Sequence, residues 1–419
     1  MIELLKQVRV IDPLAKTDQI ADVAIASGFI QAIEQEICDL PTDSQQHDCR
    51  GLILGPGLID LYSHSGEPGF EERETIASLK RAAFKGGFTR LAILPDTNPP
   101  VDNPGGLALL RKASEISRDS APNLYFWGAL TINIQGQQMT ELAELAAAGV
   151  VGFADGQPVN NLALLRRILE YLKPLQKPVA LWPKDRNLAS NGVMREGADS
   201  IRLGLPGNPA ISETSALAAL LEVVAATETP VHLMRISTAR SVELIRDAKA
   251  RGLPITASTT WMHLLLDTSA ISSYNPALRL EPPLGNPRDR TALIAGVREG
   301  VIDAIAIDHA PYTYEEKTVA FGEAPPGAIG LELALPLLWQ ELVETGYLSA
   351  WQLWRSLSTQ PAHCLQQEPP APTVGARAEL VLFDPLKKWT VDTQTLESRS
   401  QNTPWLGQTL TGRVLQIWN

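Results

Sequence analysis

The stretch Pro56-Gly57-Leu58-Ile59-Asp60-Leu61-Tyr62-Ser63-His64 sets the pattern that the rest of the chain follows. It opens with an apolar run, typical of a buried parallel strand, and it ends in polar side chains. Helical periodicity follows over residues 75–85, and a second apolar run covers 90–94. A strand that leads through a polar loop into an amphipathic helix and then into another strand is a βα unit.

The same unit recurs between residues 54 and 368. Strand-like apolar runs lie at 57–61, 90–94, 124–127, 150–153, 179–182, 230–233, 255–258 and 304–307. Helical periodicity lies at 75–85, 162–172, 212–226, 239–250 and 288–299. Eight βα units predict an α/β fold, the (β/α)8 TIM-like barrel. A doubly wound sheet is the alternative, but the first strand is not followed by the Gly-rich G-x-G-x-x-G turn of that fold.

Both ends of the chain carry short strand patterns instead. Residues 7–11, 22–26 and 29–33 alternate near the N-terminus, and residues 378–383 and 412–418 do so near the C-terminus. We expect the two ends to meet in one small β-sandwich domain. The predicted division is 1–53 and 369–419 for the two parts of that domain, and 54–368 for the barrel.

Charge and cysteine content exclude several classes of protein. The 419 residues contain 36 Lys and Arg against 47 Asp and Glu, a net charge of -11, which argues against binding to nucleic acid or to an anionic membrane. Cys38, Cys49 and Cys364 are too widely spaced for a disulfide framework, which indicates a reducing compartment. The sequence shows neither a signal peptide nor a membrane span, so we expect a cytoplasmic protein.

Polar residues after the strands are the candidates for chemistry, because a barrel places the carboxyl ends of its strands at one face. His64 follows the first strand, Asp155 the fourth and Asp308 the last. We expect these three side chains to converge. A simpler structural role competes at each position: His64 held by packing and hydrogen bonds, a turn bond for Asp155 and an ion pair for Asp308.

At this point the chain resembles the type I dihydroorotases of the amidohydrolase superfamily, the branch close to the hydantoinases and allantoinases. The resemblance rests on motifs that occur in the family's order, among them PGLID at 56–60, EPGFE at 67–71, DTNP at 96–99, IST at 236–238 and IAIDHAP at 305–311. It implies a metal-binding barrel with a sheet domain made from both chain ends. It also implies a zinc cofactor and hydrolysis of a cyclic amide in pyrimidine biosynthesis.

The chain departs from that family where the metal and the substrate are held. Family residues are replaced at seven such positions, which are Tyr62, Gly66, Asp96, Trp182, Arg235, Glu281 and Tyr312. Histidines are lost at Tyr62, Trp182, Arg235 and Tyr312, a substrate-binding Arg at Gly66, and Asn at Asp96 and Glu281. The resemblance leaves His64, Asp155 and Asp308 as remnant metal positions, and Asp308 is also the position of the family's catalytic base.

These replacements predict a degraded metal site without a bound cofactor. Catalytic zinc needs three or more nitrogen or oxygen ligands, and a permanent positive charge at Arg235 repels a divalent cation. Trp182 offers no lone pair. We expect Arg235 to pair with Asp308 or Asp155 and to take the electrostatic place of the metal.

Three hypotheses for function follow. The first is an inactive dihydroorotase-like protein that, as the resemblance implies, is a structural partner of aspartate transcarbamoylase and itself a homo-oligomer. The second is an active cyclic amide hydrolase of the dihydroorotase or hydantoinase type, with an altered metal site that uses Zn²⁺. In this hypothesis Asp96 and Glu281 favour a neutral or cationic substrate. The third is a binding module whose barrel pocket takes a small effector.

Overall fold

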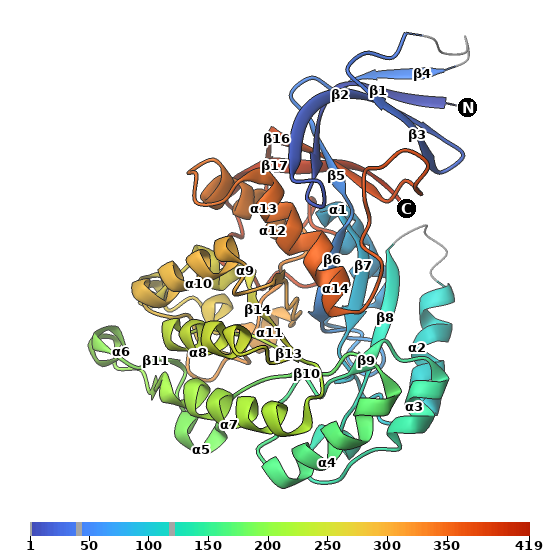
Figure 1. Cartoon of the computed structure of the whole chain (residues 1–419). Coiled ribbons are helices and arrows are strands. Elements are labelled where there is room, and N and C mark those ends of the chain that lie inside the picture. The colour runs from blue at the N-terminus through green and yellow to red at the C-terminus, as the bar shows by residue number, and fades with distance from the viewer. Residues whose placement is uncertain (1, 39–43, 117–121) are drawn as a thin grey trace.

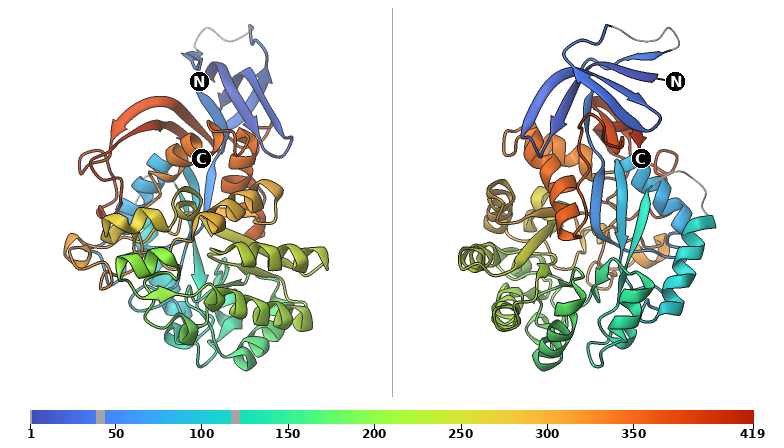
Figure 2. Two further views of the ribbon diagram at one scale, coloured as in Figure 1. Left: turned by 90° about the vertical axis from the view of Figure 1, so that its left-hand side faces the viewer. Right: turned by 45° about the vertical axis from the view of Figure 1, so that its right-hand side comes forward.

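The computed structural model describes residues 2–38, 44–116 and 122–419. It shows a barrel of strands and helices with a β-sheet domain at one end (Figure 1). Both termini lie at that sheet end, as the two further views in Figure 2 show.

Strands from both ends of the chain form the sheet domain, as the sequence predicted. Within the described residues the hydrogen-bonded order is β17-β16-β5-β1-β2-β3, and β4 pairs with β1. The strands are β1 (Ile2–Asp12), β2 (Thr17–Ala26), β3 (Phe29–Glu34), β4 (Gln45–Asp48), β5 (Ile53–Pro56), β16 (Leu380–Thr390) and β17 (Thr409–Trp418). The antiparallel pairing of β5 with β16 joins the two ends of the chain. The domain boundaries given above stay predictions.

All eight predicted barrel strands are confirmed, with ends that differ by two residues at most. They are β6 (Leu58–Ser63), β7 (Phe88–Ile93), β8 (Asn123–Gly128), β9 (Gly152–Phe153), β10 (Ala180–Leu181), β13 (Val231–Leu233), β14 (Ile255–Thr260) and β15 (Ala304–Ala306). The strands pair in parallel in two series, β6-β7-β8-β9 and β10-β13-β14-β15. A parallel bridge between Phe153 and Val179 joins the two sets.

The barrel closes between the last strand and the first. The backbone N–H of His64 donates to the carbonyl of His309 at 2.9 Å. Asp60, in β6, accepts from the N–H of Ile307 at 2.7 Å and from the hydroxyl of Ser63 at 2.5 Å. Burial raises the pKa of the Asp60 carboxyl to about 7. This buried side chain therefore ties β6 to the segment that follows β15.

Helices cover the outside of the barrel, and the five predicted ones are confirmed. The longer helices are α1 (Ile76–Gly86), α2 (Pro104–Ile116), α3 (Leu142–Ala148), α4 (Leu162–Leu172), α7 (Ile211–Thr227), α8 (Ala239–Ala250) and α10 (Pro287–Glu299). The shorter ones are α5 (Arg186–Ala189), α6 (Ala198–Leu203), α9 (Trp261–Leu265), α11 (Tyr314–Lys317), α12 (Ala334–Leu338), α13 (Ala350–Trp354) and α14 (Gln360–Cys364). A capping box at Thr75 starts α1, and Gly87 ends it in the left-handed conformation.

A half-buried ion pair connects the barrel to the terminal sheet. Arg90, in β7, donates from Nε and Nη2 to the two oxygens of Glu379, at 2.8 and 2.7 Å. Its Nη1 also donates to the carbonyl of Glu368 at 2.9 Å.

Among the described residues, no helix is long and apolar enough to cross a membrane.

Replacing Asp60 by alanine tests the barrel closure. We expect Asp60→Ala to lower the free energy of unfolding by about 1–3 kcal/mol, because the buried N–H of Ile307 loses its acceptor. Urea unfolding followed by circular dichroism measures the change. Asp384→Ala is the control, since that carboxylate accepts two N–H groups in an exposed turn. Equal losses in the two variants would contradict a special role for Asp60.

Candidate functional site

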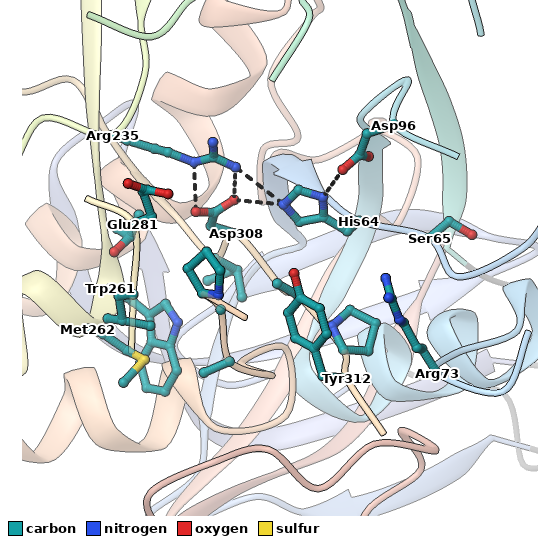
Figure 3. A pocket seen from close by; sticks show the side chains of 18 of the residues that line it. His64, Ser65, Arg73, Asp96, Arg235, Trp261, Met262, Glu281, Asp308 and Tyr312 are labelled. Atoms are coloured by element: carbon teal, nitrogen blue, oxygen red, sulfur yellow. Dashed lines mark hydrogen bonds and ion pairs between the residues drawn. The ribbon is translucent and has the colours of Figure 1, made fainter. Parts of the chain in front are cut away.

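A cavity opens at the carboxyl ends of the barrel strands (Figure 3). His64 reaches it from the end of β6, Asp96 from the end of β7, Arg235 from the end of β13 and Asp308 from the end of β15. These four side chains, which we call the mouth cluster, come from four separate segments of the sequence. The barrel brings them together because parallel strands end at the same face.

Arg235 and Asp308 form the centre of the mouth cluster. The guanidinium donates from Nε to Oδ2 at 2.8 Å and from Nη2 to Oδ1 at 2.6 Å, a two-pronged ion pair. The third nitrogen, Nη1, donates to the carbonyl of Gly156 at 2.9 Å. Arg235 is only 4% exposed, and its guanidinium carbon lies 4.7 Å from the centre of the Trp182 ring. Of the two partners that the sequence left open for Arg235, the structure selects Asp308.

His64 links this ion pair to Asp96. Its Nδ1 lies 2.5 Å from Oδ2 of Asp96, and its Nε2 lies 3.4 Å from Oδ1 of Asp308. The Nη2 of Arg235 is 3.2 Å from the same Nε2. Figure 3 shows the resulting row of charges from Arg235 through Asp308 and His64 to Asp96.

The mouth cluster is charged but electrically balanced. Burial lowers the pKa of the His64 imidazole, but the neighbouring Asp96 and Asp308 raise it more, to about 9. Burial also raises the pKa of the Asp308 carboxyl, yet Arg235 and His64 bring it far below its usual range. Near neutral pH two positive groups, Arg235 and His64, therefore face two carboxylates.

One replaced family position, Tyr62, supports the backbone of Arg235 at the end of a buried hydrogen-bonded chain. The hydroxyl of Tyr62 accepts the backbone N–H of Arg235 at 3.1 Å and lies 2.9 Å from Oγ of Ser258. Burial raises the pKa of the Tyr62 hydroxyl, so the phenol stays neutral. His232 completes this buried chain, with its Nε2 2.8 Å from Ser258, and burial lowers its pKa to about 3.

Asp155 does not join the mouth cluster, which corrects the expectation that it converges with His64 and Asp308. Its Oδ1 accepts from the N–H groups of Leu130 and Thr131, at 2.8 and 3.0 Å, and its Oδ2 accepts from the Thr131 hydroxyl at 2.6 Å. The carboxylate is thus used to hold the loop after β8. Its role is structural, but these bonds join distant segments and are not the local turn bond that the sequence suggested.

Gly66 leaves no room for a side chain at the former substrate-binding position. A Cβ atom there would lie 2.3 Å from the carbonyl oxygen of Glu74 and 2.4 Å from that of Phe70. The N–H of Phe70 donates to the carbonyl of Gly66 at 2.6 Å, which folds this loop back on itself. The path of the backbone in this loop therefore excludes an Arg side chain at position 66.

Two further ion pairs at the mouth were not predicted. Lys184, after β10, pairs with Glu281, and its Nζ lies 5.2 Å from the centre of the Trp182 ring. Arg73 pairs with Glu316 at 2.5 Å. The guanidinium of Arg73 lies 4.9 Å from the Tyr312 ring, whose hydroxyl has its pKa raised to about 12 by burial. The position of Lys184 after a strand could have indicated that it lies at the mouth. Its partner Glu281 could not be found in this way, because it is 97 residues away in the sequence.

The residues at the mouth do not fit a divalent metal ion. In residues 2–38, 44–116 and 122–419, no group of three or more His, Cys, Asp or Glu side chains is arranged to hold one. Both oxygens of Asp308 are bonded to Arg235, and a protonated His64 has no free lone pair for a metal.

Comparisons with known proteins agree with the resemblance seen in the motifs. A family described as dihydro-orotase-like matches residues 51–241. The chain is 46% identical to a probable dihydroorotase-like protein of Synechocystis sp., with 98% of each chain covered. It is 38% identical to a dihydroorotase of Pelobacter propionicus, over 98% of this chain and 96% of that one.

Solved structures of hydantoinases share the fold. The L-hydantoinase of Arthrobacter aurescens superposes with a TM-score of 0.83 at 20% identity, covering 98% of this chain and 93% of that one. The dihydropyrimidinase of Brevibacillus agri gives 0.81 at 20% identity, over 100% and 93%. Similarity along nearly the whole length of the curated relatives, together with this barrel and its two-ended sheet, shows that the chain belongs to the dihydroorotase family.

Proposed function

We propose that this protein is a dihydroorotase-like member of its family that lacks dihydroorotase activity and serves as a structural partner of aspartate transcarbamoylase. The observation that carries the first half of the proposal is the ion pair between Arg235 and Asp308. It occupies the carboxylate at the family's catalytic-base position and puts a fixed positive charge at a family ligand position.

Loss of hydrolysis follows from the chemistry that remains. Zinc-assisted hydrolysis of an amide needs a bound metal that lowers the pKa of water, and a base whose pKa is near the working pH. The ligand His64 is protonated, and the Asp308 carboxyl is held ionised by Arg235. No catalytic step is therefore assigned to this site.

Substrate binding is weakened as well. The family's substrate is an anion, and here its recognition residues are replaced by Gly66 and by the carboxylate of Asp96. Asp96 is ionised, because the pKa of its carboxyl is lowered by His64 even though burial raises it. A negative group at this position repels an anionic substrate.

The partnership is supported by the family resemblance, since inactive dihydroorotase-like barrels are structural partners of the transcarbamoylase. The 98% coverage of each chain in the match with the Synechocystis relative is consistent with a complete barrel kept as a scaffold. We also propose a homo-oligomer in the cytoplasm, with no nucleic-acid partner and no zinc cofactor. The free thiols of Cys38, Cys49 and Cys364 and the net charge of -11 support this placement.

An activity assay tests the first half of the proposal. We expect the purified protein, supplied with excess Zn²⁺, to show no ring closure of carbamoyl aspartate above background. Elemental analysis of the same sample is expected to show less than one zinc per chain. Growth of a dihydroorotase-deficient strain rescued by this protein would contradict the proposal. Turnover of a neutral lactam or hydantoin would instead support the altered hydrolase.

An assembly experiment tests the second half. We expect the protein and aspartate transcarbamoylase from the same organism to co-elute as one larger species in size exclusion with light scattering. An active dihydroorotase from an unrelated organism is the negative control, because its surface has not been shaped by this partner. Elution of the two proteins as separate species over the whole concentration range would contradict the partnership.

The protonation of His64 gives a pH test. Burial lowers the pKa of its imidazole, but Asp96 and Asp308 raise it from 6.5 to about 9. Because the folded pKa is the higher one, the stabilisation is fully present below pH 6.5 and is lost as pH rises through 9. Asp96→Asn removes one carboxylate, and we expect the pKa of His64 to fall by about one unit or more.

An NMR titration of the His64 ring in the wild type and in Asp96→Asn measures this shift. Asp384→Asn, in a distant exposed turn, serves as the matched charge control and is expected to leave the titration unchanged. Wild-type His64 titrating near its ordinary value would contradict a charged mouth cluster.

A further inference from the structure

One nitrogen of Arg235 stands between two atoms that are spaced like the ligands of a metal. Its Nη2 is 2.6 Å from Oδ1 of Asp308 and 3.2 Å from Nε2 of His64, and those two atoms are 3.4 Å apart. Two ligand atoms bound at about 2.1 Å to one tetrahedral zinc ion lie about 3.4 Å from each other. We infer that the Arg235 guanidinium is the resident cation of this barrel mouth, a built-in structural replacement for a divalent ion.

The guanidinium makes the connections that a structural cation makes. It is bonded to Asp308, after β15, whose Oδ1 also faces the protonated His64 after β6, and Asp96 extends the link to the segment after β7. Its Nη1 reaches the carbonyl of Gly156, after β9. One side chain from β13 therefore holds together loops from around the whole mouth.

Three of the replaced positions act as one unit. Tyr62 accepts the backbone N–H of Arg235, Trp182 packs against the guanidinium, and Arg235 supplies the charge. The backbone is also adapted, since Arg235 and Asp308 both take left-handed conformations, with φ of 55° and 52°. Such conformations cost energy in residues other than glycine, so they persist where contacts compensate for it. The three replacements that remove metal ligands, at Tyr62, Trp182 and Arg235, are thus the same three that introduce and support the internal cation.

It follows that Arg235 is the side chain that keeps divalent ions out. The variant Arg235→His removes the fixed charge, frees both oxygens of Asp308 and adds an imidazole nitrogen beside His64. Three donors would then be available to one ion, the minimum for a stable zinc site. Arg235→Met removes the charge without adding a donor. Arg90→Met is the matched control, because it breaks another two-pronged Arg–carboxylate pair, the half-buried one between Arg90 in β7 and Glu379.

The experiment compares the melting temperature and zinc content of the wild type and the three variants, each with EDTA and with excess ZnCl2. Without metal we expect all three variants to melt lower than the wild type by on the order of 5–10 °C, as for a buried ion pair that loses one partner. Zinc should raise the melting temperature of Arg235→His by several degrees and bind at one ion per chain. It should leave the wild type, Arg235→Met and Arg90→Met within error of their values in EDTA.

Three results would overturn the inference. The first is stoichiometric zinc on the wild type. The second is an Arg235→His protein that is no more stable or soluble with zinc than without it. The third is an equal zinc effect in Arg235→His and in the double variant Arg235→His/Asp308→Asn, because the proposed ion needs the Asp308 carboxylate. The readout is independent of the transcarbamoylase partnership and of any enzyme assay, so this inference and the proposed function can fail separately.

Discussion

The buried ion pair between Arg235 and Asp308 is the interaction on which the barrel mouth depends. Removing one partner of a buried pair leaves an uncompensated charge and costs about 3–5 kcal/mol. Here we expect the loss of stability to be larger, because Asp308 also pairs with His64, and His64 with Asp96. Arg235 helps to keep the Asp308 carboxyl ionised, and Asp308 and Asp96 in turn raise the pKa of His64.

The same constraint explains how a barrel that matches its family along its whole length can present different chemistry. Barrel strands and closure are set by packing and by buried bonds such as those of Asp60. The loops carry the chemistry, and they can change while the strands stay. At Gly66 the loop backbone leaves no room for a side chain, and after β13 the guanidinium of Arg235 is bonded to Asp308.

Much of the fold was predictable because its signals are local. The apolar runs that became the eight barrel strands and the periodic stretches that became α1, α4, α7, α8 and α10 depend only on neighbouring residues in the sequence. The meeting of the two chain ends in one sheet domain was expected from alternation at both ends, but the pairing of β5 with β16 that joins them depends on contacts between distant segments. The site was predictable in part: His64, Asp155 and Asp308 were expected to converge because they follow barrel strands, and His64 and Asp308 do. Arg235 was expected to pair with Asp308 or Asp155, and it pairs with Asp308.

The sequence by itself determined the eight-unit barrel, the two-ended sheet and the identity of the replaced positions at its mouth. Only the tertiary structure decided which charges pair. It turned the Asp155 carboxylate toward Leu130 and Thr131, joined Lys184 to Glu281, and placed Arg235 between Asp308 and His64. The physical reason is range: periodicity is read within a few residues, whereas a buried charge takes the partner that the folded loops bring within about 3 Å of it.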